Sequence, residues 1–315
     1  MLHQFNRQLE RIMPLIAPSS VIVGVLFADS LSQFAFLVPW IFAFMTFAGS
    51  LSSNFNSLQK AIAHPLPIII AFLSLHIIMP LWAFAIGHLT FSGDMLTITG
   101  LILAMVIPTG ITSFIWVSIC KGNIALTLSI ILIDTILSPF IVPYTMSLFV
   151  GTTVEMNVSS IMVGLFLMVV IPSLIGMCLN QFTKGRIKDS WGTRLAPFSK
   201  LCLAVVIMIN CAAVAPFLRV VNWKLILIAC VMFFVAFCGY LLAWCIGVLF
   251  KRDKEEIITL TFTGGMRNIS AGAVIAVAYF PAAVAVPVVL GMLFQQILAS
   301  IYGQLLGRYY NKQVS

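Results

Sequence analysis

The chain consists of long apolar runs separated by short polar stretches. About 20 apolar residues are what an α-helix needs to cross the hydrocarbon core of a bilayer. No convincing small-residue cleavage site follows the first run, so we expect a retained helix there rather than a signal peptide. The pattern predicts an all-α polytopic membrane protein of about ten transmembrane helices, near residues 12–28, 32–50, 66–88, 95–119, 123–149, 159–180, 198–218, 224–250, 256–280 and 282–307.

Two of these runs are interrupted near their centres. The fourth contains Pro108 and Gly110, and the ninth contains Gly264 and Gly265. Proline removes a backbone donor and glycine weakens helix interiors, so the freed backbone groups must be buried in protein or line a wet cavity. A simple kink explains either break alone. Two breaks, each followed by polar residues, favour a binding site formed by Thr112, Ser113, Arg267 and Asn268.

The two interruptions lie roughly 155 residues apart and divide the chain into halves of five spans, 1–155 and 156–315. Because five is an odd number, the second half enters the membrane inverted. Broken helices at matching places of inverted halves are typical of a transporter's site at the middle of the bilayer. We expect unwinding at Thr109–Thr112 and Gly264–Met266.

Three ionisable residues lie about ten or eleven residues into their spans, counted from the same side: His76, Asp134 and Arg267. At 1.5 Å per residue they share one level near mid-bilayer, where ionisable groups nearly always face protein or a cavity. We expect Asp134 and Arg267 to lie within direct or water-mediated contact. This pair is either a structural lock, an anion site at Arg267, or part of a proton-exchanging site with His76. Gln295 is a weaker candidate, because helix–helix hydrogen bonds explain many such amides.

Composition and charge support this membrane topology. Hydrophobic residues make up 61% of the 315 and charged residues only 8%, against about 25% charged in soluble domains. The net charge of +8 is spread over short loops, which does not favour nucleic-acid binding. The positive-inside rule places both termini in the cytoplasm of a multi-pass protein of the cell membrane. The basic residues on that side are Arg7, Arg11, Lys60, Lys121, Lys184, Arg186, Lys188, Arg194, Lys200, Lys251, Arg252, Lys254, Arg308 and Lys312.

Motifs for catalysis or for a metal are absent from the sequence. The seven cysteines stand singly in apolar helices, without a CxxC or a nearby His pair, and cysteine often packs as a small hydrophobe. No Gly-rich phosphate loop, Ser–His–Asp set or HExxH occurs. We therefore expect neither an enzyme nor a bound cofactor, and we make no assignment of a metal site.

The chain resembles the bile acid:sodium symporter family, as a bacterial homologue of the intestinal bile acid transporter. The resemblance covers nearly the full length and rests on HIIMP in the third span, PTGITS followed by CKGNIALTLS in the fourth and fifth, and GGMRN in the ninth. It implies a panel domain of spans 1, 2, 6 and 7 beside a core domain of spans 3–5 and 8–10. In that core the unwound fourth and ninth helices cross.

Departures from the sodium-coupled members fall at the family's ion ligands. Those members carry Ser-Asn after the fourth-helix break, and a Ser and a Thr one turn apart in the fifth span. They also carry an acidic residue at the start of the ninth-span motif, a Gln before its Asn, and a Gln in the third span. In the same order, this chain has Ser113 and Phe114 after the fourth-helix break, and Thr127 and Ile131 in the fifth span. It has Thr263 in place of the acidic residue, Arg267 in place of the ninth-span Gln, and His76 in place of the third-span Gln.

These departures leave Ser113, Thr127, Asn268 and backbone carbonyls as ion ligands, and they add a guanidinium that repels a cation. The first hypothesis is a secondary transporter of a small organic anion that is independent of sodium or coupled to protons. The second is sodium symport at a shifted site using Asp134, Thr135 and Thr127. The third is a membrane sensor or structural subunit without transport. The substrate and the oligomeric state stay open.

Overall fold

The computed structural model describes residues 16, 18–53, 65–151 and 153–311. The start of the first expected span and the basic residues Arg7, Arg11, Lys60 and Lys312 lie outside this part. Within it the chain is helical, and the β structure is limited to one isolated bridge between Thr109 and Arg267. The expected all-α fold is confirmed.

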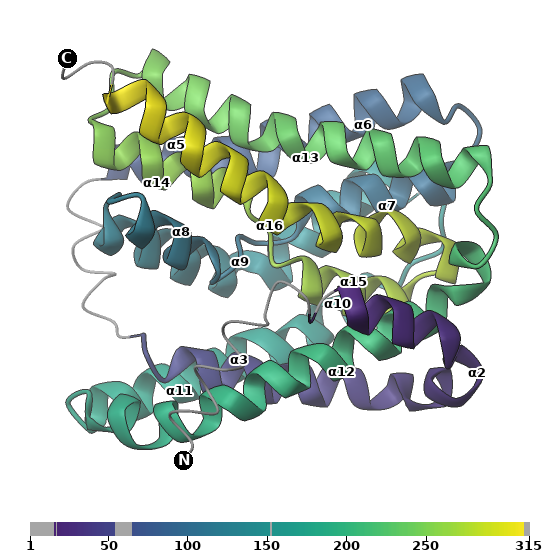
Figure 1. Ribbon diagram of the computed structural model, residues 1–315, viewed down its shortest axis with the longest axis horizontal. Helices are drawn as coiled ribbons and strands as arrows, with labels where there is room; N and C mark the ends of the chain where they lie inside the picture. The colour runs from purple at the N-terminus through teal and green to yellow at the C-terminus, as the bar shows by residue number, and fades with distance from the viewer. Residues whose placement is uncertain (1–15, 17, 54–64, 152, 312–315) are drawn as a thin grey trace.

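The helices follow one another in chain order with short connections (Figure 1). The first half contains α2 (Ala28–Leu31), α3 (Val38–Ser50), α5 (Pro65–Leu73), α6 (Met79–Thr90), α7 (Met95–Val106), α8 (Ser113–Ile119) and α9 (Ile124–Val150). The second half contains α10 (Val158–Leu165), α11 (Ile171–Phe182), α12 (Thr193–Leu218), α13 (Trp223–Leu249), α14 (Lys254–Gly265), α15 (Ile269–Tyr279) and α16 (Ala282–Asn311). Single irregular turns join some neighbours into longer helices, at Ser32–Leu37, Ser74–Ile78, Phe166–Val170 and Lys188–Gly192.

In the described part, seven of the resulting helices are long and apolar enough to cross a membrane: Ala28–Ser50, Pro65–Thr90, Ile124–Val150, Val158–Phe182, Lys188–Leu218, Trp223–Leu249 and Ala282–Tyr310. Two shorter apolar helices, α7 and α15, belong to the fourth and ninth expected spans, the interrupted ones. The chain is therefore a multi-pass membrane protein, and its helix ends agree with the apolar pattern to within a few residues for most spans.

Asparagine and aspartate side chains set where many of these helices begin. Each caps its helix by accepting a hydrogen bond from the backbone N–H three residues later, as N-cap residues do. The distances run from 2.8 Å for Asp253 to 3.4 Å for Asn268. The capped helices are α7, α9, α10, α13, α14 and α15, with the caps Asp94, Asn123, Asn157, Asn222, Asp253 and Asn268.

The helices lie roughly parallel to one axis in two groups (Figure 1). Helices α2, α3, α11 and α12 lie along the lower side of the view, and α12 packs against α2 and α3. The remaining long helices form the larger group, in which α7 packs against α6, α9 and α16. Contacts of α12 with α15 and α16 join the groups. Ten of the twelve residues of α7 and seven of the eleven residues of α15 are buried, so both broken helices lie largely in the interior.

The ninth-span break differs from the expected place. Helix α14 runs through Gly264 and Gly265, and the unwound segment is Met266–Asn268. A Cβ at Gly265 would lie 2.3 Å from ring atoms of Tyr240 on α13, and one at Gly264 would lie 2.6 Å from the Ala243 Cβ. The glycines allow close packing of α14 on α13 rather than unwinding. In the fourth span the unwound residues are 107–112, which include the expected four.

Candidate functional site

The two unwound segments meet as a short antiparallel pair. Thr109 stands opposite Arg267 in an isolated bridge. The amide of Gly110 donates to the carbonyl of Met266 at 3.0 Å, and the amide of Asn268 donates to the carbonyl of Pro108 at 2.8 Å. These bonds satisfy backbone groups that a membrane interior cannot solvate. The breaks are thus stabilised by each other, and their flanking side chains converge on one place.

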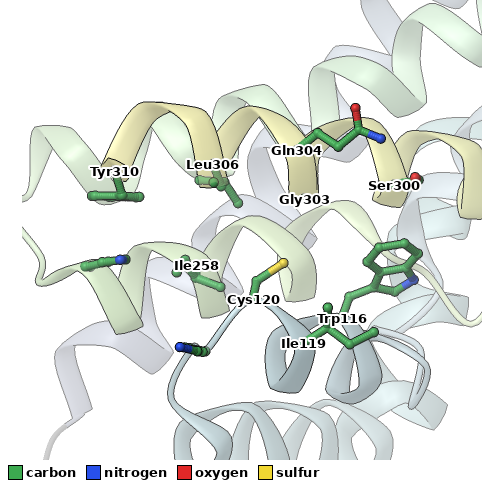
Figure 2. A pocket seen from close by; sticks show the side chains of 12 residues that line it. Trp116, Ile119, Cys120, Ile258, Ser300, Gly303, Gln304, Leu306 and Tyr310 are labelled. Atoms are coloured by element: carbon green, nitrogen blue, oxygen red, sulfur yellow. The ribbon is translucent and has the colours of Figure 1, made fainter. Parts of the chain in front are cut away.

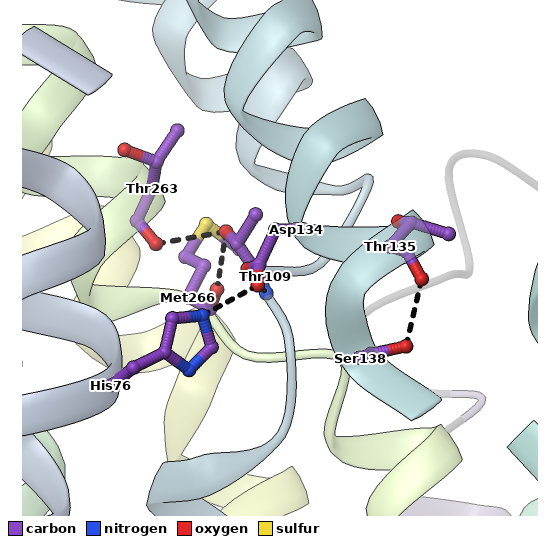
Figure 3. Close-up of polar contacts among 7 residues, drawn as sticks. All are labelled: His76, Thr109, Asp134, Thr135, Ser138, Thr263 and Met266. Atoms are coloured by element: carbon purple, nitrogen blue, oxygen red, sulfur yellow. Dashed lines mark hydrogen bonds and ion pairs between the residues drawn. The ribbon is translucent and has the colours of Figure 1, made fainter. Parts of the chain in front are cut away.

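Thr109 is the centre of this hydrogen-bond network (Figure 3). Its hydroxyl lies 2.8 Å from the carbonyl oxygen of Thr263 and 2.9 Å from that of Met266, at the end of α14. Its amide donates to Oδ2 of Asp134 on α9 at 2.6 Å. One residue after the proline therefore ties together the fourth, fifth and ninth spans. Thr109 is not among the site residues predicted from the sequence, although its position directly after Pro108 could have indicated it.

Asp134 is fully buried and both of its oxygens are engaged. Oδ2 accepts from the Thr109 amide, and Oδ1 lies 2.7 Å from Nε2 of His76. His76 comes from the π-helical turn Ser74–Ile78, a type of irregular turn often found at functional sites. Its other ring nitrogen, Nδ1, is buried without a hydrogen-bond partner in the described part. Of the direct or water-mediated contact expected between Asp134 and Arg267, the direct form does not occur in the described part, where the side-chain partner of Asp134 is His76.

The Arg267 side chain is buried, with 1% of its surface exposed. Both terminal guanidinium nitrogens, Nη1 and Nη2, lack a hydrogen-bond partner among the described residues. Asp134 and Tyr240 are close enough to act on this charge electrostatically. The backbone of Arg267 is fixed more firmly, because its amide donates to Oε1 of Gln295 on α16 at 3.2 Å. A buried cation is thus held in place with unused donors.

Two further candidates retain free polar atoms or partial exposure near the break. Ser113 begins α8, is fully buried, and its hydroxyl has no hydrogen-bond partner in the described structure. Thr112 precedes it as a half-buried N-cap whose side chain makes no capping bond. With Arg267 and His76, Ser113 belongs to a small set of buried polar groups with bonding capacity left over. Such groups in a native structure call for a ligand, a water or another explanation.

The other candidates hold the structure together. The Asn268 side chain caps α15, and the hydroxyl of Thr263 donates to the carbonyl of Thr259 at 2.8 Å. Thr127 lies fully buried on α9, where its hydroxyl donates to the carbonyl of Asn123 at 2.8 Å. The distance from its hydroxyl to that of Thr259 is 3.5 Å. Gln295 contacts the Arg267 backbone as described above. These residues position the crossing.

The arrangement combines a buried cation, a buried carboxylate–imidazole pair and free hydroxyls at one crossing. Such a site can bind an anion or exchange a proton. Among the described residues, no group of three His, Cys, Asp or Glu is placed to hold a metal ion. Helix α15, eleven residues long, begins beside Arg267 and adds the positive end of its dipole.

Comparison with known proteins places the chain among transporters. The model of the sodium bile acid symporter family matches residues 39–222, more than half of the chain. The chain belongs to this family. The resemblance inferred from HIIMP, PTGITS and GGMRN is thereby confirmed, and the relatives' names describe transporters rather than enzymes where they state an activity.

Relatives cover most of the chain. A Bacillus subtilis (strain 168) protein named "Uncharacterized protein YbaS" is 57% identical over 297 residues, which is 94% of this chain and 97% of that protein. The "Uncharacterized sodium-dependent transporter YocS" of the same organism is 23% identical and spans 92% of this chain and 90% of its own length. The "Probable sodium/metabolite cotransporter BASS1, chloroplastic" of Oryza sativa subsp. japonica is 28% identical, over 80% of this chain and 60% of its length.

Proposed function

We propose that this protein is a secondary transporter of a small organic anion that works by alternating access without sodium, with Arg267 standing in for the cation. The observation that carries the proposal is the buried Arg267 guanidinium at the helix crossing, with Nη1 and Nη2 free of partners in the described structure. A fixed positive charge there repels a sodium ion and offers two donors to a carboxylate. The planar fork of arginine suits bidentate binding of that group.

The architecture supports the alternating-access part of the proposal. Residues 1–155 and 156–315 would form two inverted repeats, each with one broken helix. Helices α2, α3, α10, α11 and α12 would rock as a panel against a core of the remaining helices, with both termini in the cytoplasm and the protein in the cell membrane. Paired broken helices are typical of transporters built in this way. A sensor or structural subunit would have less reason to keep two unwound segments in its interior.

Protons are the coupling ion that the site favours. Asp134 and His76 form a buried pair that can gain or lose a proton while the Thr109 amide continues to donate to Oδ2. Because Nδ1 of His76 has no partner in the described part, it is the atom where an added proton would need a new acceptor, such as a substrate or a water. The proton would then move with the opening and closing of the site.

Sodium symport at a shifted site is the second candidate, favoured by relatives whose names state sodium dependence. Its ligands would be Asp134, Thr135 and Thr127. Thr127 and Asp134 are seven residues apart on α9, which is roughly 10 Å along a helix, too far to ligate one ion together. The Asp134 oxygens already accept from His76 and Thr109. These distances support sodium-independent transport over the shifted site.

Uptake into proteoliposomes tests the proposal. Candidate organic anions would first be chosen by a ligand-dependent thermal-shift screen in sodium-free buffer. Their uptake would then be measured with sodium, potassium or choline outside, each with and without an inward proton gradient. We expect equal uptake in the three salts and faster uptake with the proton gradient. Strict sodium dependence would overturn the sodium-independent mechanism, and absence of uptake for every ligand that binds would favour the sensor.

A further inference from the structure

A groove of about 450 Å³ lies away from the crossing, between the end of α8, the start of α14 and the last turns of α16 (Figure 2). Its rim carries two lysines and a tyrosine, and its wall is apolar. The residues that matter here are Lys121, Lys254 and Tyr310 on the rim, and Ile119, Ile258 and Leu306 on the wall. Lys121 and Lys254 stand next to helix ends, the depth at which a membrane surface is expected.

The charges of the two lysines are not paired with carboxylates in the described structure. Neither makes an ion pair with any residue that the structure describes, while Lys254 lies 5.2 Å above the Tyr310 ring. The neighbouring acids are Asp253, Glu255 and Glu256. Asp253 caps α14 through the Glu256 amide, and the Glu256 carboxylate lies 3.7 Å from Arg252. Lys121 adopts a left-handed backbone conformation, with φ of 60°, that closes the turn between α8 and α9.

The apolar wall continues into exposed hydrophobic residues on two helices. On α8 and the turn before it, Ile111, Ile115 and Ile119 are 43%, 54% and 64% exposed. On α16, Ile297, Ile301 and Leu305 are exposed at the same four-residue spacing. At Gly307 an added Cβ would meet no atom within 4 Å, so the groove is open there. The basic rim therefore leads onto surface that an acyl chain can cover.

We propose that this groove binds one anionic phospholipid, with its phosphate between Lys121 and Lys254 and an acyl chain along Ile119, Ile258 and Leu306. The unpaired charges fit a phosphate, and basic pockets between transmembrane helices are suited to anionic headgroups. A small soluble anion would leave the apolar wall uncovered. The lipid would sit against α8 and α14, the half-helices that pack against each other on one side of the crossing, and so connect the bilayer to the transport site.

Native mass spectrometry of the intact protein with added lipid tests the proposal. The probes are palmitoyl-oleoyl phosphatidylglycerol and the phosphatidylcholine with the same chains. We expect tighter binding of the glycerol lipid, weakened roughly fivefold for each of Lys121→Gln and Lys254→Gln. Gly307→Leu places a side chain in the groove, where an added Cβ meets no atom within 4 Å, and is expected to reduce binding of both lipids. Lys251→Gln is the control, because Lys251 is exposed and left-handed like Lys121 but does not line the groove.

Three results would overturn the proposal. The first is equal binding of the two lipids by the wild-type protein, together with no change in the lysine variants. The second is full displacement of phosphatidylglycerol by millimolar sn-glycerol 3-phosphate, which would show that the groove selects a soluble phosphate and not a lipid. The third is unchanged lipid binding in folded Gly307→Leu protein, because the acyl chain would then lie elsewhere.

Discussion

Among single residues, Arg267 carries the most unusual chemistry. Burying an ion without matched partners destabilises the folded state by several kcal/mol, because the ion loses its hydration and gains no compensating charge. In this structure the cost is only partly offset, since Nη1 and Nη2 have no hydrogen-bond partner in the described part. Asp134 acts on the charge from a distance while bonding to His76 and Thr109. Under the proposed function, the negative charge of a bound substrate would offset this cost.

Replacing Arg267 is the first test at this scale. We expect Arg267→Gln to lower organic-anion uptake at least tenfold, because the charge that binds the anion and replaces the cation is lost. Arg267→Lys should recover only part of it, since the planar fork is lost. Arg308→Gln, at an exposed arginine near the end of α16, is the matched control. Normal uptake by a well-folded Arg267→Gln protein would show that the arginine is not essential.

The His76–Asp134 pair leads to a second test. His76→Gln keeps a donor for Oδ1 of Asp134 but removes the imidazole that the proposed proton coupling requires. We expect wild-type uptake to accelerate with an inward proton gradient and the variant to lose most of that dependence. His88→Gln is the control, because His88 contacts Phe84 at the far end of α6. An unchanged gradient dependence in His76→Gln would assign proton coupling to another group.

Depth along a helix can be counted from sequence, but direction around it cannot. The count placed His76, Asp134 and Arg267 at one level, and the structure brings His76 onto Asp134 and Arg267 beside Thr109. No direct hydrogen bond between Asp134 and Arg267 occurs in the described part; Asp134 bonds instead to His76, which lies in the π-helical turn Ser74–Ile78. The apolar pattern of the third span has no periodicity from which this π-helical turn could be predicted. A water-mediated contact between Asp134 and Arg267 stays a prediction.

At the scale of elements, the close contact of α14 with α13 depends on a missing side chain. A Cβ at Gly265 would fall within 2.3 Å of the Tyr240 ring, whose hydroxyl donates to the Gln295 carbonyl at 3.1 Å. The sequence placed unwinding at the glycines because glycine weakens helices. The Tyr240 contact that explains them comes from a residue 25 positions away, which local propensity does not contain.

Gly265→Ala tests this packing. Overpacking a close interface costs roughly 1–3 kcal/mol, so we expect a clear fall in the melting temperature of the detergent-solubilised protein. Gly307→Ala is the matched control on α16: its Cβ meets no atom within 4 Å, and alanine is the better helix former. We expect that variant to be neutral or slightly more stable. Equal melting temperatures for Gly265→Ala and the wild type would mean that α13 and α14 can move apart freely.

The start of α7 offers a test of stability against pH. Burial raises the pKa of Asp94, but hydrogen bonds from Lys224 and Thr97 outweigh it and leave the pKa below its usual value. Because the pKa of Asp94 is lower in the folded state, its ionised carboxylate stabilises the fold at pH values above its unfolded-state pKa of about 4. This stabilisation is lost as the pH falls through the folded-state pKa.

We therefore expect Asp94→Ala to lower stability at pH 7, with a smaller difference from wild type near pH 3. Its ion pair with Lys224 is 2.8 Å long but largely exposed, so most of the loss, about 1 kcal/mol, is the helix cap. Asp29→Ala, at a 94% exposed carboxylate, is the control. A pH-independent deficit for Asp94→Ala would assign the effect to packing alone.

At the scale of the whole molecule, contacts of α12 with α15 and α16 join the two groups of helices. The apolar pattern predicted most of these helices well, because span length and end caps are local properties. How α12 packs on α15 and α16 is not local, and neither is the pairing of Pro108–Gly110 with Met266–Asn268. The family resemblance supplied the expectation of a crossing that periodicity alone could not.

A fixed charge at the crossing has a consequence for the stability of the whole protein in different salts. A ligand that binds only the folded state raises its stability by RT ln(1 + [L]/Kd), about 2.7 kcal/mol at 100 times Kd. If Arg267 replaces the coupling cation, the melting temperature of the wild-type protein should be the same in sodium chloride and in choline chloride at equal ionic strength. Arg267→Gln should melt lower in choline and recover in sodium, because the family resemblance implies a Gln at this position in sodium-coupled members. A sodium-dependent rise in the wild type, absent in Thr127→Val, would instead place a sodium ion near α9. Arginine and ion would then have to occupy different places in the crossing.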